Sequence, residues 1–156
     1  MQVAKIISLE SRRAEHAKRL RQRALAGFPW NELMEYTRVI LNPVTARLPV
    51  NKRWMIEESV YRLAYESFLL GIQASRKIYR EMRGGAEKSQ WKERVERDFL
   101  AEGDRLISQT AHDFQLFQVL DEWLSQSVIV VMEDLMPRWL IRGVEYGLLL
   151  RKQRRI

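Results

Sequence analysis

The sequence contains no cysteine, and this absence excludes several kinds of site. Disulfide bonds, thiolate nucleophiles and metal centres with cysteine ligands all need the missing thiol. Histidine is nearly absent as well, since His16 and His112 are the only two. Neither follows a glutamate at the Glu-x-x-His spacing of a di-iron bundle, because Arg13 and Gln109 occupy those positions. We therefore expect neither a metal nor a cofactor.

The motifs of common enzymes are missing too. The chain has no glycine-rich phosphate loop and no Gly-x-Ser-x-Gly nucleophile elbow. Adjacent carboxylates such as Glu57 and Glu58 point about 100° apart on a helix, so they make solvated faces rather than acid/base pairs. No catalytic residue and no small-molecule site is predicted, and we interpret the protein as non-enzymatic.

Glycine and proline are scarce, with 7 and 4 among 156 residues. So few helix breakers favour long helices over a fold of many strands. The length fits one domain over residues 1–156. We predict an all-α, single-domain bundle of five or six helices.

Long apolar runs are also absent. The longest uncharged stretch, residues 123–132, is half of the about 20 residues that a membrane-spanning helix needs. The first residues lack the apolar run of a signal peptide. We expect a cytoplasmic protein without a membrane span.

The strongest predicted helix covers residues 52–83 and ends at Gly84 and Gly85. Its apolar positions span a wide arc, which is typical of the central helix of a bundle. Small residues on this arc, among them Gly71, allow a neighbouring helix to approach closely.

Five further helices are predicted around this central one from capping residues, prolines and apolar spacing. They cover residues 8–26, 29–41, about 89–107, 113–135 and 138–154. The segment 42–50, with Pro43 and Pro49, is predicted as a loop, and Pro137 is predicted to separate the last two helices. The β-branched run 128–131 would suit a buried strand as well; a helix is favoured because no partner strand is visible.

The N-terminal segment 1–26 is basic and has only a narrow apolar stripe, formed by Leu9, Ala17, Leu20 and Ala24. A helix with so little apolar surface buries little, so we expect a peripheral arm.

Charge is unevenly distributed along the chain, whose formal net charge is +7. Residues 1–25 hold seven basic residues against two acidic ones, and residues 138–156 hold six against one. Residues 102–134 hold seven acidic residues against one basic. This asymmetry indicates a polyanionic partner, or ends that fold onto the acidic centre of the same or a second copy. The candidate anion- or partner-binding residues are Arg12, Arg19, Arg23, Arg151, Lys152, Arg154 and Arg155.

Two further glycines lie in the last helix. Gly143 and Gly147 stand four residues apart, so they share one helix face. Such a face lets another helix cross closely, either within the chain or in a second copy, and the sequence leaves both alternatives open.

The leading functional hypothesis is a helical interaction or scaffold protein that self-associates as a homodimer or binds another protein. It rests on the wide apolar arc, the glycine face and the matched charges of ends and centre. The alternative is a nucleic-acid-binding accessory protein that uses the basic N- and C-terminal helices, because lysine and arginine neutralise phosphates.

Three segments share a charged helical texture: "RRAEHAKRLRQRAL", "AYESFLLGIQASRKIYRE" and "WLIRGVEYGLLLRKQRR". In these segments the chain resembles an uncharacterised family of small helical cytosolic proteins from Bacillus-type bacteria. The resemblance implies a bacterial, cytosolic setting. It implies no activity and assigns no functional residue.

Overall fold

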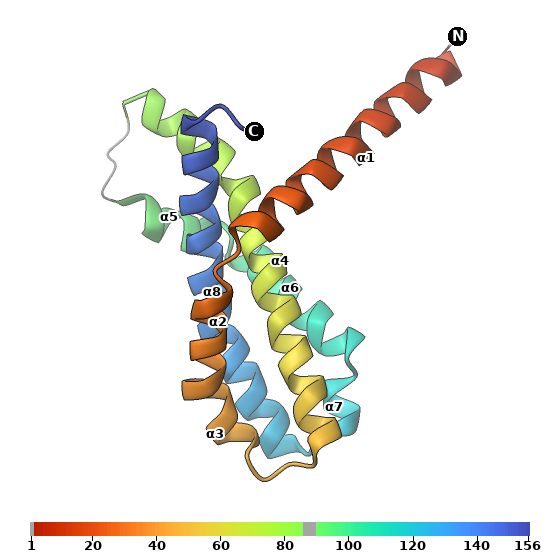
Figure 1. The fold of residues 1–156 in the computed structure, drawn as a ribbon, viewed down its shortest axis with the longest axis vertical. Helices are drawn as coiled ribbons and strands as arrows, with labels where there is room; N and C mark the ends of the chain where they lie inside the picture. Colours follow the sequence, from red (N-terminus) through yellow and green to blue (C-terminus); the bar gives the residue numbers. More distant parts are fainter. Residues whose placement is uncertain (1, 86–89) are drawn as a thin grey trace.

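A computed structural model describes residues 2–85 and 90–156, with side chains from residue 8 onward (Figure 1). The regular elements in these ranges are all helical, which confirms the predicted all-α bundle. In chain order they are α1 (Gln2–Gly27), α2 (Trp30–Tyr36), the π-helical η1 (Thr37–Leu41), α3 (Asn42–Thr45), α4 (Val50–Arg83), α5 (Trp91–Asp98), α6 (Leu100–Asp113), α7 (Leu116–Val119) and α8 (Glu122–Lys152).

Helices α4 and α8 form the centre of the bundle and run parallel to each other (Figure 1). Gly71 lies against Gly143, and one turn later Ser75 lies against Gly147. The predicted central helix is confirmed, since α4 covers Val50–Arg83 and ends at Gly84. Its buried side chains include Phe68 and other large apolar residues, and each such side chain stabilises the fold by about 1.5–3 kcal/mol.

Helix α2 and its continuation lie along one side of α8 and run in the opposite direction (Figure 1). The Tyr36 hydroxyl donates to the Asp134 carboxylate at 2.9 Å, and it lies 3.2 Å from the Val131 carbonyl oxygen. The Tyr36 ring meets Trp139 edge-on, with centroids 5.4 Å apart. Burial, together with the Asp134 carboxylate, raises the pKa of Tyr36.

The predicted loop 42–50 is wrong over its first half, because Asn42–Thr45 is helical. Pro43 stands in the first turn of α3, which continues directly from the π-helical η1, so its missing N–H falls at the junction of the two helical segments. Thr37 begins the preceding π-helical turn, and its hydroxyl donates to the Leu33 carbonyl at 2.9 Å. The connection to α4 is therefore only residues 46–49.

The predicted break at Pro137 is also wrong, because α8 continues through this residue from Glu122 to Lys152. Pro137 has no N–H to donate to the carbonyl of Glu133, one turn before it. Glu133 is exposed, so water can donate to this carbonyl instead. Buried side chains on both sides of the proline hold the helix together. Residues 128–131 lie inside α8, so the helical interpretation of this run is confirmed.

The segment between α4 and α8 is divided differently from the prediction. The predicted helix 89–107 is divided at Phe99, where the backbone leaves helical geometry, into α5 and α6, and α6 runs on to Asp113. Residues 86–89 lie outside the described ranges. The predicted helix 113–135 begins instead at Glu122, after Gln115 in the left-handed region and the short α7. The Asp121 carboxylate caps α8 by accepting from the Leu124 N–H at 2.8 Å.

Candidate polyanion interface

Helix α1 leaves the bundle and projects into solvent (Figure 1). Every residue from Ser8 to Arg19 is exposed, and even Leu9 is 53% exposed. Contact with the body begins at the buried Leu20 and Ala24, and Arg21 forms an ion pair of 3.5 Å with Glu66 of α4. In the described part of the chain, α1 is thus held at its C-terminal end.

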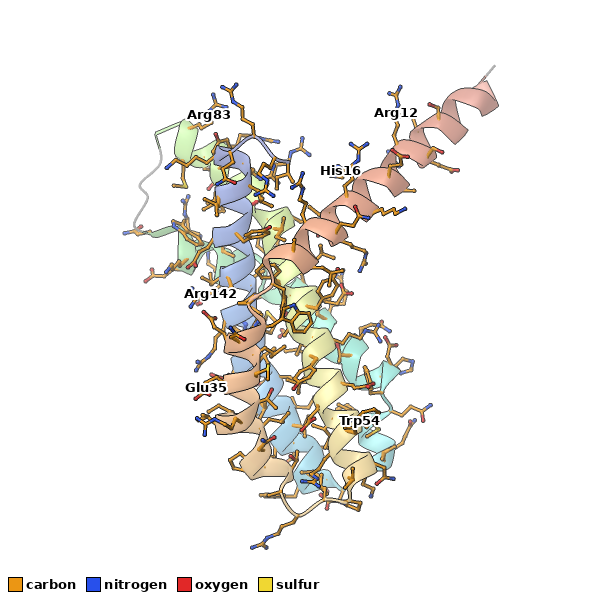
Figure 2. All side chains as sticks on the ribbon, viewed as in Figure 1. Arg12, His16, Glu35, Trp54, Arg83 and Arg142 are labelled. Atoms are coloured by element: carbon orange, nitrogen blue, oxygen red, sulfur yellow. The ribbon has the colours of Figure 1, made fainter. Side chains whose placement is uncertain are left out.

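A basic stripe follows one side of α1. Arg12, His16, Arg19 and Arg23 recur at spacings of four, three and four residues, so they share one helix face. Figure 2 shows Arg12 and His16 on the side of α1 that faces the ends of α4 and α8. The stripe therefore faces the C-terminal end of α8 across the open angle between α1 and the bundle.

The C-terminal end of α8 packs against α4 through Arg151. Its Nε donates to the Ser75 hydroxyl at 2.9 Å, and its NH2 donates to the Ile72 carbonyl at 3.5 Å. Burial lowers the pKa of Arg151, and the positive charges of Arg76 and Arg80 lower it further. This guanidinium is half-buried among other cations.

Beyond Arg151, the chain turns back with Arg154 in the left-handed region, at φ 57°. The Arg155 N–H donates to the Leu150 carbonyl at 2.8 Å, and the Arg154 N–H donates to the Arg151 carbonyl at 3.0 Å. This is a Schellman C-cap, in which the left-handed position is usually glycine. The turn brings the last residues toward α1 (Figure 1).

The two ends of the chain meet in a cleft of about 530 Å³ between α1 and the C-terminal turn. We call it the basic cleft; it is lined by His16, Arg19, Leu20, Gln22, Arg23, Ala26, Arg155 and Ile156. Its lining holds three arginines and no aspartate or glutamate side chain, and Arg19 forms an exposed ion pair of 3.5 Å with Glu15 on the same helix. The structure thus joins residues that lie more than 130 positions apart in the sequence.

A wider positive surface adjoins the basic cleft at the ends of α4 and α8, where Figure 2 shows Arg83. We call it the basic end; its members are Arg76, Arg80, Arg83, Arg151, Lys152, Arg154 and Arg155. None of them forms an ion pair with a carboxylate of the described residues. The C-termini of two parallel helices supply only about −0.5 charge each. Seven cations exceed this compensation several-fold, so the basic end attracts anions.

The predicted anion-binding residues therefore fall into two adjoining groups. Arg19, Arg23 and Arg155 line the basic cleft itself. Arg12 extends the same stripe along α1, and the remaining three belong to the basic end. None of these predicted residues forms an ion pair with a described carboxylate of the acidic segment 102–134; the Asp113 carboxylate pairs instead with Arg62 at 2.6 Å. Within the basic segment 138–156, Arg138 does pair with Asp134, at 3.3 Å.

Sequence reasoning missed His16 and three arginines of α4, namely Arg76, Arg80 and Arg83. The available signal was the run of cations in the last two turns of the predicted helix 52–83. Their role depends on α4 and α8 running parallel, which brings both C-termini to one end of the molecule. Sequence spacing within single helices carries no information about that direction.

The close-packing glycines are used within the chain. A Cβ on Gly71 would lie 2.8 Å from the Gly143 Cα, and one on Gly143 would overlap the Phe68 carbonyl oxygen. A Cβ on Gly147 would overlap the Ser75 hydroxyl. The glycine face of α8 is thus covered by α4 of the same copy.

Two of the other cavities on the body exceed the basic cleft in volume. A groove of about 870 Å³ follows α8 between α2–η1 and α5; its apolar members include Val39, Ile40 and Ile141, and its rim carries charges of both signs. A second cavity of about 550 Å³ lies between α6, α7 and α8 and contains Asp104 and Glu133. The described residues hold no cluster of His, Asp and Glu suited to a metal ion. None of the described helices is long and apolar enough to cross a membrane.

Comparison with known proteins gives no match at any level. A scan against protein-family models finds no matching family. Searches of curated proteins and of solved structures likewise find no match. The resemblance to the Bacillus-type family therefore stays a prediction.

Proposed function

We propose that this protein is a non-enzymatic, nucleic-acid-binding helical protein. The observation that carries the proposal is the basic cleft, where the basic stripe of α1 meets Arg155 with no acidic side chain in the lining. Phosphate groups neutralise such clusters and release counterions, which is the dominant source of affinity in sequence-independent binding.

The charge balance supports this function over internal pairing. The basic end has no ion pair with described carboxylates, whereas bases of the body do pair, such as Arg62 with Asp113 and Arg142 with Glu32. A cation that has an intramolecular partner gains little from an external anion. The basic end retains its full charge for a partner.

Arginine supports the same conclusion. Six of the seven members of the basic end are arginine, whose planar guanidinium forms two parallel hydrogen bonds to a phosphate. Arg151 is already oriented by its hydrogen bonds to α4, so less side-chain entropy is lost when it meets an anion.

Fluorescence anisotropy with labelled 20-nucleotide strands and duplexes tests the proposal. We expect binding at about 50 mM salt that weakens steeply toward 200 mM, with a linear dependence on the logarithm of salt concentration. The double variant Lys152→Gln/Arg155→Gln should weaken binding about a hundredfold at 50 mM salt and reduce the salt slope by about two. Both side chains are exposed, so the fold should persist.

A matched control separates local charge from net charge. Arg38→Gln/Arg47→Gln removes two exposed cations from the opposite end of the bundle, and it should leave affinity within about threefold. Absence of binding to every strand and duplex at 50 mM salt, or equal losses in both double variants, would refute the proposed function.

The second candidate is a self-associating scaffold protein. Two observations favour it: the partly apolar groove along α8, and the acidic residues Asp104, Glu122 and Glu133, which form no ion pair with described residues. The basic end of one copy would then meet the acidic side of another. Light scattering after size exclusion at micromolar concentrations tests this candidate; a strict monomer at low salt, where such contacts are strongest, rules it out.

A further inference from the structure

We infer that the nucleic acid bound at the basic cleft is a DNA duplex, with α1 lying in its major groove. This inference rests on the proposed function and adds the class of nucleic acid and the element that enters it. Its first observation is that Ser8–Arg19 is exposed on every side, so the helix has room for a duplex around it (Figure 1).

The dimensions agree with this arrangement. An α-helix with its side chains is about 10–12 Å across, and the major groove of B-form DNA is about 12 Å wide. Residues 8–23 span about 24 Å, which corresponds to about seven base pairs. The groove of A-form RNA is deep and too narrow for a helix, so the same projection would not enter an RNA duplex.

The lining of the basic cleft argues against a single strand. Proteins that hold single strands stack the bases on aromatic side chains, and each stacked base contributes about 1–3 kcal/mol. The basic cleft contains no aromatic residue, and α1 has none along its length. Its arginines, together with Gln22, instead supply the side-chain types that contact phosphates and base edges in the major groove.

The basic end would provide further contacts to the phosphate backbone of the duplex. With α1 in the groove, the basic end lies across the open angle from the Arg12 stripe, where the neighbouring phosphate backbone would run (Figure 2). Arg76, Arg80 and Arg151 belong to α4 and α8, whose close packing fixes the two backbones relative to each other. The Arg151 side chain is held as well, by its hydrogen bonds to Ser75 and Ile72. The projecting helix and the rigid end thus have separate tasks.

Competition binding distinguishes this inference from the general function. We expect a 20-base-pair DNA duplex to bind at least tenfold tighter than either of its strands and than an RNA duplex of the same sequence, all at 100 mM salt. Equal or tighter binding of a single strand or of the RNA duplex would overturn the inference and leave the proposed function intact. Failure of all four probes to bind would remove both.

Two α1 variants of equal charge test which face enters the groove. Arg12→Gln/Arg23→Gln changes the stripe that faces the basic end, whereas Arg13→Gln/Lys18→Gln removes two cations that point about 100° or more away from Arg12. We expect the first variant to lose at least tenfold more duplex affinity than the second. Equal losses would contradict the placement of α1.

A footprint provides a readout that does not depend on affinity. Dimethyl sulfate methylates guanine N7, which lies in the major groove. With saturating wild-type protein on a short duplex, we expect N7 protection over about seven base pairs, together with slower amide hydrogen exchange in Ser8–Arg19. Unprotected N7 atoms on a fully bound duplex would overturn the inference.

Discussion

Helices α1 and α4 are both long, with 26 and 34 residues, but their surroundings are opposite. Helix α4 has buried residues from Ile56 to Ile78, which α8 and the flanking helices cover, whereas the described side chains of α1 meet the body from Leu20 onward. An exposed helix of about 12–15 residues is marginally stable in water without packing or a ligand. The α4–α8 seam therefore holds the fold together, whereas α1 is the element to which the proposed function assigns recognition, so substitutions in each region should affect different measurements.

The seam gives the largest expected effect. Gly143→Ala should lower the free energy of unfolding by about 3 kcal/mol, because its Cβ would overlap the carbonyl of Phe68 and drive α4 away. The higher helix propensity of alanine, about 1 kcal/mol, does not offset this overlap. Urea unfolding followed by circular dichroism measures the change.

Gly84→Ala is the matched control for the seam. Its Cβ would meet the nearest carbonyl oxygen at 3.4 Å, an ordinary contact, and its φ of −80° suits alanine. We expect a change below about 0.5 kcal/mol. Similar losses for Gly143→Ala and Gly84→Ala would contradict the close packing of α4 and α8.

The boundary between the two regions can be located within α1 itself. Leu20→Ala should cost about 2 kcal/mol, the low end for a buried leucine, because Leu20 lies at the rim of the core with 8% exposure. Leu9→Ala, on the projecting part, should stay within about 0.5 kcal/mol of the wild type. If the two leucine substitutions cost the same, α1 does not dock where the structure places it.

A polar contact of the body gives a smaller, pH-dependent effect. Tyr36→Phe removes the hydrogen bond to Asp134 and should cost about 1 kcal/mol at neutral pH. Because the folded state raises the pKa of Tyr36, stability due to its neutral form is complete below the unfolded pKa of about 10. Above that pH, tyrosine ionises more readily in the unfolded chain, so the unfolded state binds fewer protons and stability falls. The advantage over Tyr36→Phe should therefore shrink as the pH rises beyond 10; an advantage that grows there would contradict this sign.

The sequence predicted the burial of a helix well where the apolar pattern of that one helix determines it. The wide arc of α4 and its terminal glycines identified the central helix, and the narrow stripe of α1 predicted little burial. It failed where tertiary packing overrides a local signal. Pro137 ordinarily ends a helix, yet buried side chains on both sides of it, with the freed carbonyl on the exposed face, keep α8 continuous.

The candidate site shows the same limit. The terminal cations were identified individually, but the basic cleft arises because the Arg154 turn and the docking of Leu20 bring both ends together. The contributions of Arg76 and Arg80 follow from the parallel direction of α4 and α8. Neither relation is local, so helical periodicity could not reveal it.

The smallest expected effect on stability is also the one of opposite sign. Arg154 occupies a left-handed position that costs a non-glycine residue about 1 kcal/mol, so Arg154→Gly should stabilise the last turn. Because the last turn of a helix unfolds locally before the rest, the free energy of global unfolding should rise by no more than about 0.5 kcal/mol. The same change removes a cation from the basic end, and duplex affinity should fall about tenfold at 50 mM salt. Arg154→Ala separates the two effects, because it removes the charge but keeps the backbone strain: affinity should fall equally without a gain in stability. Thermal unfolding and anisotropy on the three proteins measure both quantities. If Arg154→Gly keeps its affinity, Arg154 does not contact a phosphate. If Arg154→Ala gains as much stability as Arg154→Gly, the backbone at this position is not strained.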